Sequence, residues 1–312
     1  MSDTTKFSMG ALPSPEDERD YQFTDIAGAA TAKVIPYHSD VPDIIVNQLA
    51  SSQCGPCAIT AARYETENLQ NGNTQPLSHT WVYGHDDECT LEGMYMRTLM
   101  KIACQGIPYT TNWESWGNKS YCRSLCNAHN TEEIREEARK LRSSSYYVCN
   151  SWADVCNATR VTNGGVVIMV QVYNNWYHVN STGIVGVNSG QFYGYHFLRV
   201  KDYEILNDGK TYKIRCQNSW GEDWGDRGYC YLFSSLNGFI EARAVVDDIN
   251  EVVRKLKFTD VSEDRWSYDA INWCAENGII SGFDDGSFQP ESPATREQIA
   301  SMLYRFSQHM NS

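Results

Sequence analysis

The chain has 312 residues, and its 26 basic and 39 acidic side chains give a net charge of −13 at neutral pH. This length allows one large domain and a small one. The acidic balance argues against a nucleic-acid partner, and no run of about 18 apolar residues predicts a membrane span. No secretory signal is visible near the N-terminus. Eleven cysteines, an odd number, indicate an extracellular or cell-surface location with one free thiol.

Residues 1–40 are predicted to form an extended N-terminal leader or short pro-segment. They carry Pro13, Pro15 and Pro36 among charged residues and show no sustained hydrophobic period. A disordered tail is one interpretation of this pattern. The other is a segment that lies in or near an active-site groove and restrains activity.

The spacing of apolar residues predicts a helical half followed by a β half. Alanines at helical spacing predict a helix from Cys57 to Gln70, with Pro56 at its entrance and Gly72 at its exit. After Asn163, two glycines mark a change to strand patterns. The other predicted elements are helices at 93–104 and 131–141 and strands at 166–170, 195–204, 211–217 and 228–233.

The segment Gln53-Cys54-Gly55-Pro56-Cys57 is compatible with two chemistries. As Cys-Gly-Pro-Cys it resembles the redox motif of thioredoxins, in which both sulfurs react. As Gln-Cys-Gly-x-Cys-Ala it resembles the nucleophile segment of papain-like cysteine peptidases, in which only the second sulfur reacts. A helix N-terminus lowers the pKa of a thiol through its free N–H groups. The second interpretation therefore makes Cys57, just after Pro56, the expected nucleophile.

A thiol that attacks an amide also needs a histidine to protonate the leaving amine. His196 begins an apolar strand, where it is either held for catalysis or is a buried structural histidine. The segment from Gln217 to Tyr229 closely resembles the Asn-Ser-Trp-Gly-x-x-Trp-Gly-x-x-Gly-Tyr signature of papain-like peptidases. This resemblance implies that Asn218 orients His196 and that Trp220 shields their hydrogen bond from water. Cys57, His196 and Asn218 are therefore the predicted catalytic residues.

The resemblance covers roughly residues 40–245 and implies roles for further residues. In the family, the Cys N–H and a Gln six residues before it bind the oxyanion. Here that position is Ser51, because the segment after Gln48 is three residues longer than usual. Gln48 is the preferred oxyanion donor and Gln53 the alternative. The substrate-binding residues that the resemblance implies are Gly93, Met94, Phe197 and Trp220.

The resemblance also implies a structural disulfide between Cys54 and Cys89. Local spacing allows two more pairs, Cys122 with Cys126 and Cys149 with Cys156. Zinc ligation by Cys54, Cys57, Cys122 and Cys126 is the competing interpretation. The long spacing between the pairs and the lack of a nearby histidine cluster argue against it. We expect neither a metal ion nor a cofactor.

Residues 258–312 strongly resemble one S-layer homology repeat, a module that holds bacterial surface proteins to anionic cell-wall polysaccharide. Thr295 is the predicted N-cap of a helix that begins with Arg296. An arginine at this position, with aromatic residues nearby, suits an acidic sugar. Such repeats usually occur in threes, and here there is one. Weak binding, trimerisation and a purely structural role therefore all remain open.

Together these patterns predict an α+β, papain-like fold of two subdomains, a helical half and a β-barrel-like half, followed by a small helical S-layer homology module. The predicted boundaries are 1–40 for the leader, 41–246 for the peptidase domain, 247–257 for a linker and 258–312 for the repeat. The predicted function is a bacterial or phage cysteine endopeptidase that acts on proteins or peptides and is attached to cell-wall polymer. The alternatives are a thioredoxin-like oxidoreductase using Cys54 and Cys57, or a non-catalytic surface protein on a papain scaffold.

Overall fold

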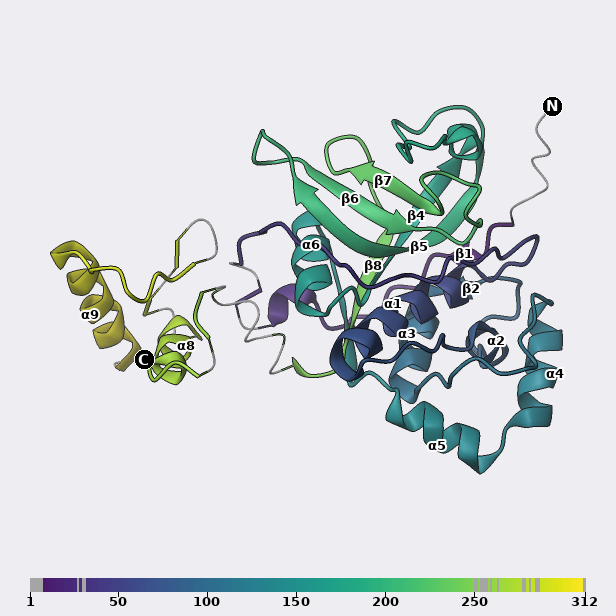
Figure 1. The fold of residues 1–312 in the computed structure, drawn as a ribbon, viewed down its shortest axis with the longest axis horizontal. Coiled ribbons are helices and arrows are strands. Elements are labelled where there is room, and N and C mark those ends of the chain that lie inside the picture. Colours follow the sequence, from purple (N-terminus) through teal and green to yellow (C-terminus); the bar gives the residue numbers. More distant parts are fainter. Residues whose placement is uncertain are drawn as a thin grey trace.

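The computed structural model describes residues 8–26, 28–29 and 32–249, and in the C-terminal part residues 252, 258, 260–262, 264–276, 279–280, 282–283 and 287–310. Up to residue 249, helices gather on one side and a sheet on the other (Figure 1). This arrangement confirms the predicted α+β class with a helical half and a β half. Most of the linker predicted at 247–257 and the first residues of the leader lie outside the described residues.

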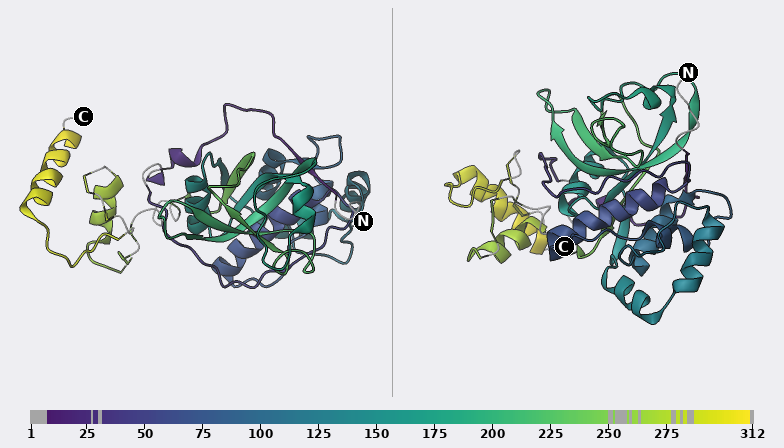
Figure 2. Two further views of the ribbon diagram at one scale, coloured as in Figure 1. Left: turned by 90° about the horizontal axis from the view of Figure 1, so that it is seen from above. Right: turned by 45° about the vertical axis from the view of Figure 1, so that its right-hand side comes forward.

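The helical half is built around one long buried helix, α1 (Cys54–Asn71). Figure 2 shows α1, in blue, between the sheet and the other helices of this half. Three of those helices start at a side-chain cap, because Ser78, Asn118 and Thr131 each accept a hydrogen bond from a backbone N–H three residues later. The other helices of this half are α2 (His79–Gly84), α3 (Met96–Gln105), α4 (Lys119–His129) and α5 (Glu132–Lys140).

The β half is one eight-stranded sheet with the order β2-β1-β5-β4-β8-β3, and β6 and β7 continue from β5. Its neighbouring strands run antiparallel except for the parallel pair β1–β2. Helix α6 (Trp152–Val161) packs on β4, β5 and β8. The strands are β1 (Ala11–Leu12), β2 (Met94–Tyr95), β3 (Ser145–Val148), β4 (Val166–Tyr173), β5 (Phe192–Ile205), β6 (Tyr212–Gln217), β7 (Tyr229–Phe233) and β8 (Glu241–Val246).

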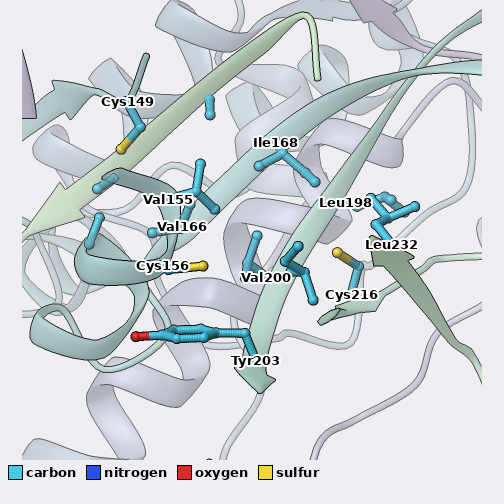
Figure 3. Close-up of a cluster of buried hydrophobic side chains, with 14 of the residues drawn as sticks. Cys149, Val155, Cys156, Val166, Ile168, Leu198, Val200, Tyr203, Cys216 and Leu232 are labelled. Atoms are coloured by element: carbon cyan, nitrogen blue, oxygen red, sulfur yellow. The ribbon is translucent and has the colours of Figure 1, made fainter. Parts of the chain in front are cut away.

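The central strand β4 and the middle of β5 are buried on both faces, which explains the long apolar run of β4. Successive side chains on a strand point to opposite faces. Ile168 and Leu198 therefore join the core beneath α6, whereas Met169 and Phe197 join the core beneath α1 and α3. Figure 3 shows part of the first core, with Ile168 and Leu198 on neighbouring strands. His196 and Phe197 consequently point to opposite sides of β5.

Buried charges join α1 to the sheet. Glu65 of α1 forms ion pairs with Arg199 and with Lys201, whose Nζ lies 2.6 Å from the carboxylate. Asp43 lies 2.9 Å from Arg199 and 3.1 Å from Lys201, and all four side chains are at most 2% exposed. Removing one member would leave a buried charge without its partner, which is costly. This cluster fixes α1 relative to β5, the strand that carries His196.

Helix α1 begins three residues earlier than the sequence predicts, at Cys54 instead of Cys57. The predicted start after Pro56 is wrong because Pro56 lies within the first turn of the helix, where a missing N–H costs nothing. The helix ends as predicted, with Gly72 in the left-handed region at φ 67°. The other two predicted helices correspond to α3 and α5, with small shifts in their bounds.

All eleven cysteines lie within the described residues, and all are free thiols. The predicted disulfide between Cys54 and Cys89 is therefore not formed in this structure. Backbone N–H groups surround the Cys54 sulfur, and the Cys89 thiol lies 3.7 Å from the Leu91 carbonyl oxygen. The pairs Cys122–Cys126 and Cys149–Cys156 are not formed either.

The C-terminal part contains α8 (Tyr268–Glu276) and α9 (Arg296–Met310). Thr295 caps α9 as predicted, because its hydroxyl accepts from the Gln298 N–H at 3.1 Å and its own N–H donates to the Gln298 side chain at 2.8 Å. The rings of Phe258 and Phe288 pack with centroids 4.9 Å apart. None of the helices in the described part of the chain has the length and apolar character needed to cross a membrane.

Candidate active site

His196 and Asn218 come together because β5 and β6 pair in antiparallel register, with Arg199 opposite Gln217. The Asn218 Oδ1 atom lies 2.7 Å from His196 Nε2. An amide oxygen only accepts hydrogen bonds, so the imidazole carries its hydrogen on Nε2. His196 Nδ1 is buried and has no hydrogen-bond partner among the described residues. In the neutral ring this nitrogen is therefore free to take a proton.

Trp220 covers the His196 ring. The two ring centroids are 4.8 Å apart, and Trp220 in turn stacks on Tyr177 at 5.6 Å. His196 and Trp220 are 0% and 1% exposed. This burial lowers the pKa of His196 to about 4, although the hydrogen bond to Asn218 acts to raise it. The imidazole is therefore neutral at neutral pH in this state of the protein.

Cys54 is the first residue of α1, and its sulfur lies against β5 and the leader. The backbone N–H groups of Phe197 and Gly10 are directed at this sulfur, as are those of Gly55 and Cys54 itself. Burial raises the pKa of the Cys54 thiol to about 11, and the four N–H groups lower it. The first N–H groups of a helix have no partner within the helix. The Cys54 N–H is therefore outside the hydrogen-bond ladder of α1.

Cys57 lies one turn further along the same helix. Its N–H donates to the Gln53 carbonyl oxygen at 3.0 Å, so it is not available to an oxyanion. Burial raises the pKa of its thiol well above the usual value, and the nearby Ser219 hydroxyl acts in the opposite direction. The structure thus places the predicted nucleophile beside the segment that follows β6, but away from the free N–H groups at the start of α1.

Gln48 is held next to the signature segment. Its N–H donates to the Ser219 carbonyl oxygen at 2.8 Å, and its Oε1 atom accepts from the Ser219 hydroxyl at 2.5 Å. These contacts fix the orientation of the amide, so that Nε2 donates to the carbonyl oxygens of Ser51 at 2.7 Å and Ser8 at 3.0 Å. Cys54 follows Gln48 by six residues. That is the spacing between oxyanion glutamine and nucleophile in the pattern to which this segment is similar.

Gln53, the alternative oxyanion donor, points elsewhere. Its Nε2 atom donates to the carbonyl oxygens of Ser115 and Gly117, both at 3.0 Å. Its Oε1 atom lies 2.7 Å from His79 Nδ1. Because these three contacts use the whole amide group, Gln53 has a structural role here.

The leader passes directly over this cluster. Strand β1 pairs with β2 on one side, where the Met94 N–H donates to the Gly10 carbonyl oxygen at 2.8 Å. On its other side Ala11 pairs with Tyr195 of β5. A side chain at Gly10 would come within 2.1 Å of the Ser52 carbonyl oxygen, so the close approach requires glycine. Residues 8–12 thus lie between the two strands that flank Cys54.

The predicted substrate-binding residues lie around the same point. Met94 and Phe197 pack in one buried cluster with Cys54 and Ala11, and Gly93 has φ 95° beside the Gly10 carbonyl oxygen. Gly93, Met94 and Phe197 thus lie around Cys54, and Asn218 and Trp220 lie around His196, whereas the Gln53 amide points away. The sequence analysis names Cys54 only as a disulfide partner or a redox cysteine, although its six-residue distance from Gln48 also makes it a candidate nucleophile.

The site contains no evident metal position. Within the ranges that the structure describes, no group of three or more His, Cys, Asp or Glu side chains could hold a metal ion. Cys122, one member of the competing zinc set, lies 3.7 Å from Gln53 Nε2. The chemistry available here is that of a thiol, an imidazole and oriented N–H donors.

Comparison with known proteins gives two separate similarities. Residues 257–300 match the model of the S-layer homology domain. The chain is 41% identical over 69 residues to an S-layer protein of Bacillus thuringiensis subsp. finitimus, which covers 22% of the chain and 8% of that protein. It is 29% identical over 167 residues to cathepsin B-like cysteine proteinase 1 of Haemonchus contortus, covering 50% of the chain. The chain covers 47% of that proteinase, or about half its length.

Among solved structures, the chain is similar to xylellain, a cysteine protease from Xylella fastidiosa, with a TM-score of 0.62 and 17% identity. The similarity covers 78% of this chain and 97% of xylellain. At this identity it shows the fold. The chain therefore combines the papain-like fold, as the sequence predicts, with an S-layer homology domain at residues 257–300.

Proposed function

We propose that this protein is a cysteine endopeptidase that hydrolyses peptide bonds in proteins or peptides and is held at the cell surface by its S-layer homology domain. The observation that carries the proposal is the 2.7 Å contact between His196 and Asn218 beneath Trp220, next to a thiol at the start of α1. A thiol, a neutral imidazole and an orienting amide are the groups that nucleophilic acyl transfer requires.

Cys54, instead of the sequence-predicted Cys57, is the sulfur to which this proposal assigns the attack. Three features support it. Cys54 is the first residue of α1, its own N–H is outside the helix ladder, and Gln48 lies six residues before it. Cys57 lacks the second feature, because its N–H is bonded to Gln53. The prediction of Cys57 as nucleophile remains the alternative, and one experiment tests both.

Hydrolysis would proceed through a thioester. His196 Nδ1 takes the thiol proton, and the Cys54 sulfur attacks the carbonyl carbon of the scissile peptide bond. The oxyanion is bound by the Cys54 N–H and Gln48 Nε2. His196 then gives the proton to the leaving amine, and a water molecule, activated by the same imidazole, hydrolyses the thioester. Asn218 keeps the imidazole in the correct tautomer and orientation throughout.

The leader would restrain this activity. In the arrangement with residues 8–12 in place, the Ser8 carbonyl accepts from Gln48 and the Gly10 N–H faces Cys54. A substrate needs access to Gln48 and Cys54, so the leader has to move before a peptide can bind. Burial also keeps both the thiol and the imidazole neutral in this state. Uncovering the site would favour the reactive thiolate–imidazolium pair.

Attachment to anionic cell-wall polysaccharide through the C-terminal module is the second part of the proposal. The match to the S-layer homology domain supports a cell-surface location. Arg296 is exposed at the first position of α9, where its guanidinium can donate to an acidic sugar. The Thr295 cap orders the turn that presents it.

Labelling with an epoxysuccinyl peptide inhibitor tests the assignment. We expect one adduct, on Cys54, together with loss of peptide hydrolysis in Cys54→Ser and its retention in Cys57→Ser. An adduct on Cys57 and an inactive Cys57→Ser protein would instead support the sequence-based choice. Reduction of insulin without any adduct would support the oxidoreductase alternative and contradict the proposal.

A further inference from the structure

The Cys-Gly-Pro-Cys motif leaves one sulfur, that of Cys57, without a role in hydrolysis. We propose that Cys57 and Cys54 are a redox-modification site, at which a reversible disulfide blocks the nucleophile and switches the peptidase off. This inference rests on the proposed function of Cys54. It explains why a second thiol lies beside the nucleophile on the same helix.

The positions of the two cysteines fit such a bond. They are three residues apart in the first turn of α1. Helix geometry puts their Cα atoms about 5 Å apart, inside the range that disulfides use. Their Cβ atoms have to approach further, and the Cys54 end of the turn can adjust because the Cys54 N–H lies outside the helix ladder, whereas the Cys57 N–H is bonded to Gln53. Pro56, between them, contributes no N–H to that ladder.

The two thiols also influence each other electrostatically. After burial, the largest effect on Cys57 comes from a charge on Cys54, which raises the Cys57 pKa. Both sulfurs are free thiols in the structure, so the pair is described here in its reduced form. Backbone N–H groups act on the Cys54 thiol and the Ser219 hydroxyl acts on the Cys57 thiol.

A cavity reaches Cys57, one member of the pair, while the leader is in place. The cavity has a volume of about 180 Å³ and is lined by Cys57, Thr60, His79, Glu114 and Trp116, among others. None of its lining residues belongs to the leader residues 8–12. This volume holds several water-sized molecules, and hydrogen peroxide is little larger. Cys57 can therefore be reached from a side that the leader does not cover.

The chemical step is balanced with a peroxide as the oxidant. Once the leader has moved off Cys54, the Cys54 thiolate attacks one oxygen of hydrogen peroxide, the O–O bond breaks, and a sulfenic acid forms while the released hydroxide takes up the thiol proton as one water. The Cys57 sulfur then displaces the hydroxyl of the sulfenic acid as a second water, and the S–S bond forms. The two thiols lose two electrons and two protons, and the peroxide becomes two waters. A dithiol reductant reverses the reaction by exchange.

The consequence is protection as well as inhibition. A lone nucleophilic cysteine under peroxide proceeds to sulfinic acid, which is irreversible for most proteins. A neighbouring thiol diverts the sulfenic acid into a disulfide that can be reduced. Under oxidising conditions the enzyme would therefore be inactive but recoverable.

The test exposes the full-length protein to hydrogen peroxide and follows two readouts, the mass of the peptide containing residues 54–57 and the rate of peptide hydrolysis. We expect this peptide to lose two hydrogens while the rate falls at least about tenfold, and dithiothreitol to restore both. In Cys57→Ser the rate should fall equally but stay low after dithiothreitol, with sulfinic acid on Cys54. Cys104→Ser, a partly buried cysteine elsewhere, is the matched control and should behave like the wild type.

Two results would overturn the inference. One is recovery of Cys57→Ser by dithiothreitol to the same extent as the wild type, and the other is inactivation while the 54–57 peptide keeps both thiols. Cys57→Ala serves as a second variant, with melting temperature as a check on folding. The mass readout needs no activity, so a disulfide without hydrolysis would overturn the proposed function alone. Hydrolysis without a disulfide would overturn this inference alone.

Discussion

The side-chain amide nitrogen of Gln48 lies 3.0 Å from the carbonyl oxygen of Ser8. The same nitrogen is the proposed donor to the oxyanion of a substrate. A leader carbonyl therefore uses a contact that catalysis would need. Autoinhibition by the leader can be tested by weakening its docking without removing it.

Gly10→Ala should raise peptidase activity. The added methyl group would lie 2.1 Å from the Ser52 carbonyl oxygen, so the leader has to shift away from Cys54. We expect an increase of about tenfold in kcat/KM, which corresponds to roughly 1.4 kcal/mol of lost docking. Gly238→Ala is the control, because a methyl group there meets nothing within 4 Å. Equal activity of Gly10→Ala and wild type would contradict autoinhibition.

Substitution is a sharper test than deletion of residues 1–35. Phe23 and Ile26 of the leader are 0% and 5% exposed in the core of the β half, and Asp20 lies 2.6 Å from Arg97. A deletion would remove these contacts as well and would destabilise the fold. Loss of activity on deletion would therefore say nothing about the groove.

Asn218→Ala should lower kcat by roughly 10- to 100-fold with a smaller effect on KM. The imidazole would no longer be held in its orientation, but its Nδ1 atom could still accept a proton. Asn218→Asp keeps an acceptor for His196 Nε2–H and should recover part of the rate. Its negative charge would also raise the pKa of His196 and move the basic limb of the pH–rate profile, at which the imidazolium loses its proton, upward. If Asn218→Asp were as slow as Asn218→Ala with an unmoved profile, a purely structural role would be favoured.

Gln48→Ala should mainly reduce catalysis, whereas Gln53→Ala should mainly reduce stability. Loss of the Gln48 donor is expected to reduce kcat by roughly 100-fold and also to lower the melting temperature, because the buried amide bonds Ser51 and Ser219 as well. Gln53→Ala removes one donor from two part-buried carbonyl oxygens and one partner from His79, so we expect destabilisation of about 2 kcal/mol without a comparable loss of kcat. Thermal melts and steady-state kinetics on the two purified variants measure both effects. Near-wild-type turnover of Gln48→Ala would reject Gln48 as the oxyanion donor.

Because of His196, the free energy of unfolding should decrease as the pH is lowered from about 6.5 to about 4. Its pKa is lowered to about 4 in the folded protein from 6.5. In this window the unfolded chain binds a proton that the folded chain does not, so the free energy of unfolding decreases as pH falls. Across this whole pH window, protonation of His196 should lower the free energy of unfolding by about 3 kcal/mol. His196→Gln should show a shallower decline in chemical denaturation, and a decline identical to wild type would contradict the prediction.

The full-length protein should sediment with protein-free bacterial cell walls, and Arg296→Ala should bind a few-fold more weakly. The guanidinium is exposed, so it can make charge-assisted hydrogen bonds to an anionic sugar, and added salt should weaken them. Arg227→Ala, with an 89% exposed side chain in the peptidase part, is the matched control. Absence of the protein from the pellet would contradict tethering, whereas equal binding of Arg296→Ala would locate the contact elsewhere in the module.

The sequence by itself determined the fold class and most of the site. The segment around Asn218 and Trp220 can be recognised from the sequence because the residues that form its tight turns, and the residues that contact His196, are close together in the chain. The positions of helix α1, the central strands and the Thr295 cap also follow from local periodicity and capping. Such features are encoded within a few residues of one another.

Only the tertiary structure decided how the two sulfurs differ. Cys54 and Cys57 are equivalent in the motif, but they lie on opposite sides of the point where the helix hydrogen bonds begin. The environment of Cys54 comes from Phe197 and Gly10, which are far away in the sequence. Long-range pairing of β1 with β2 and β5 brings them there, and no local pattern specifies that pairing.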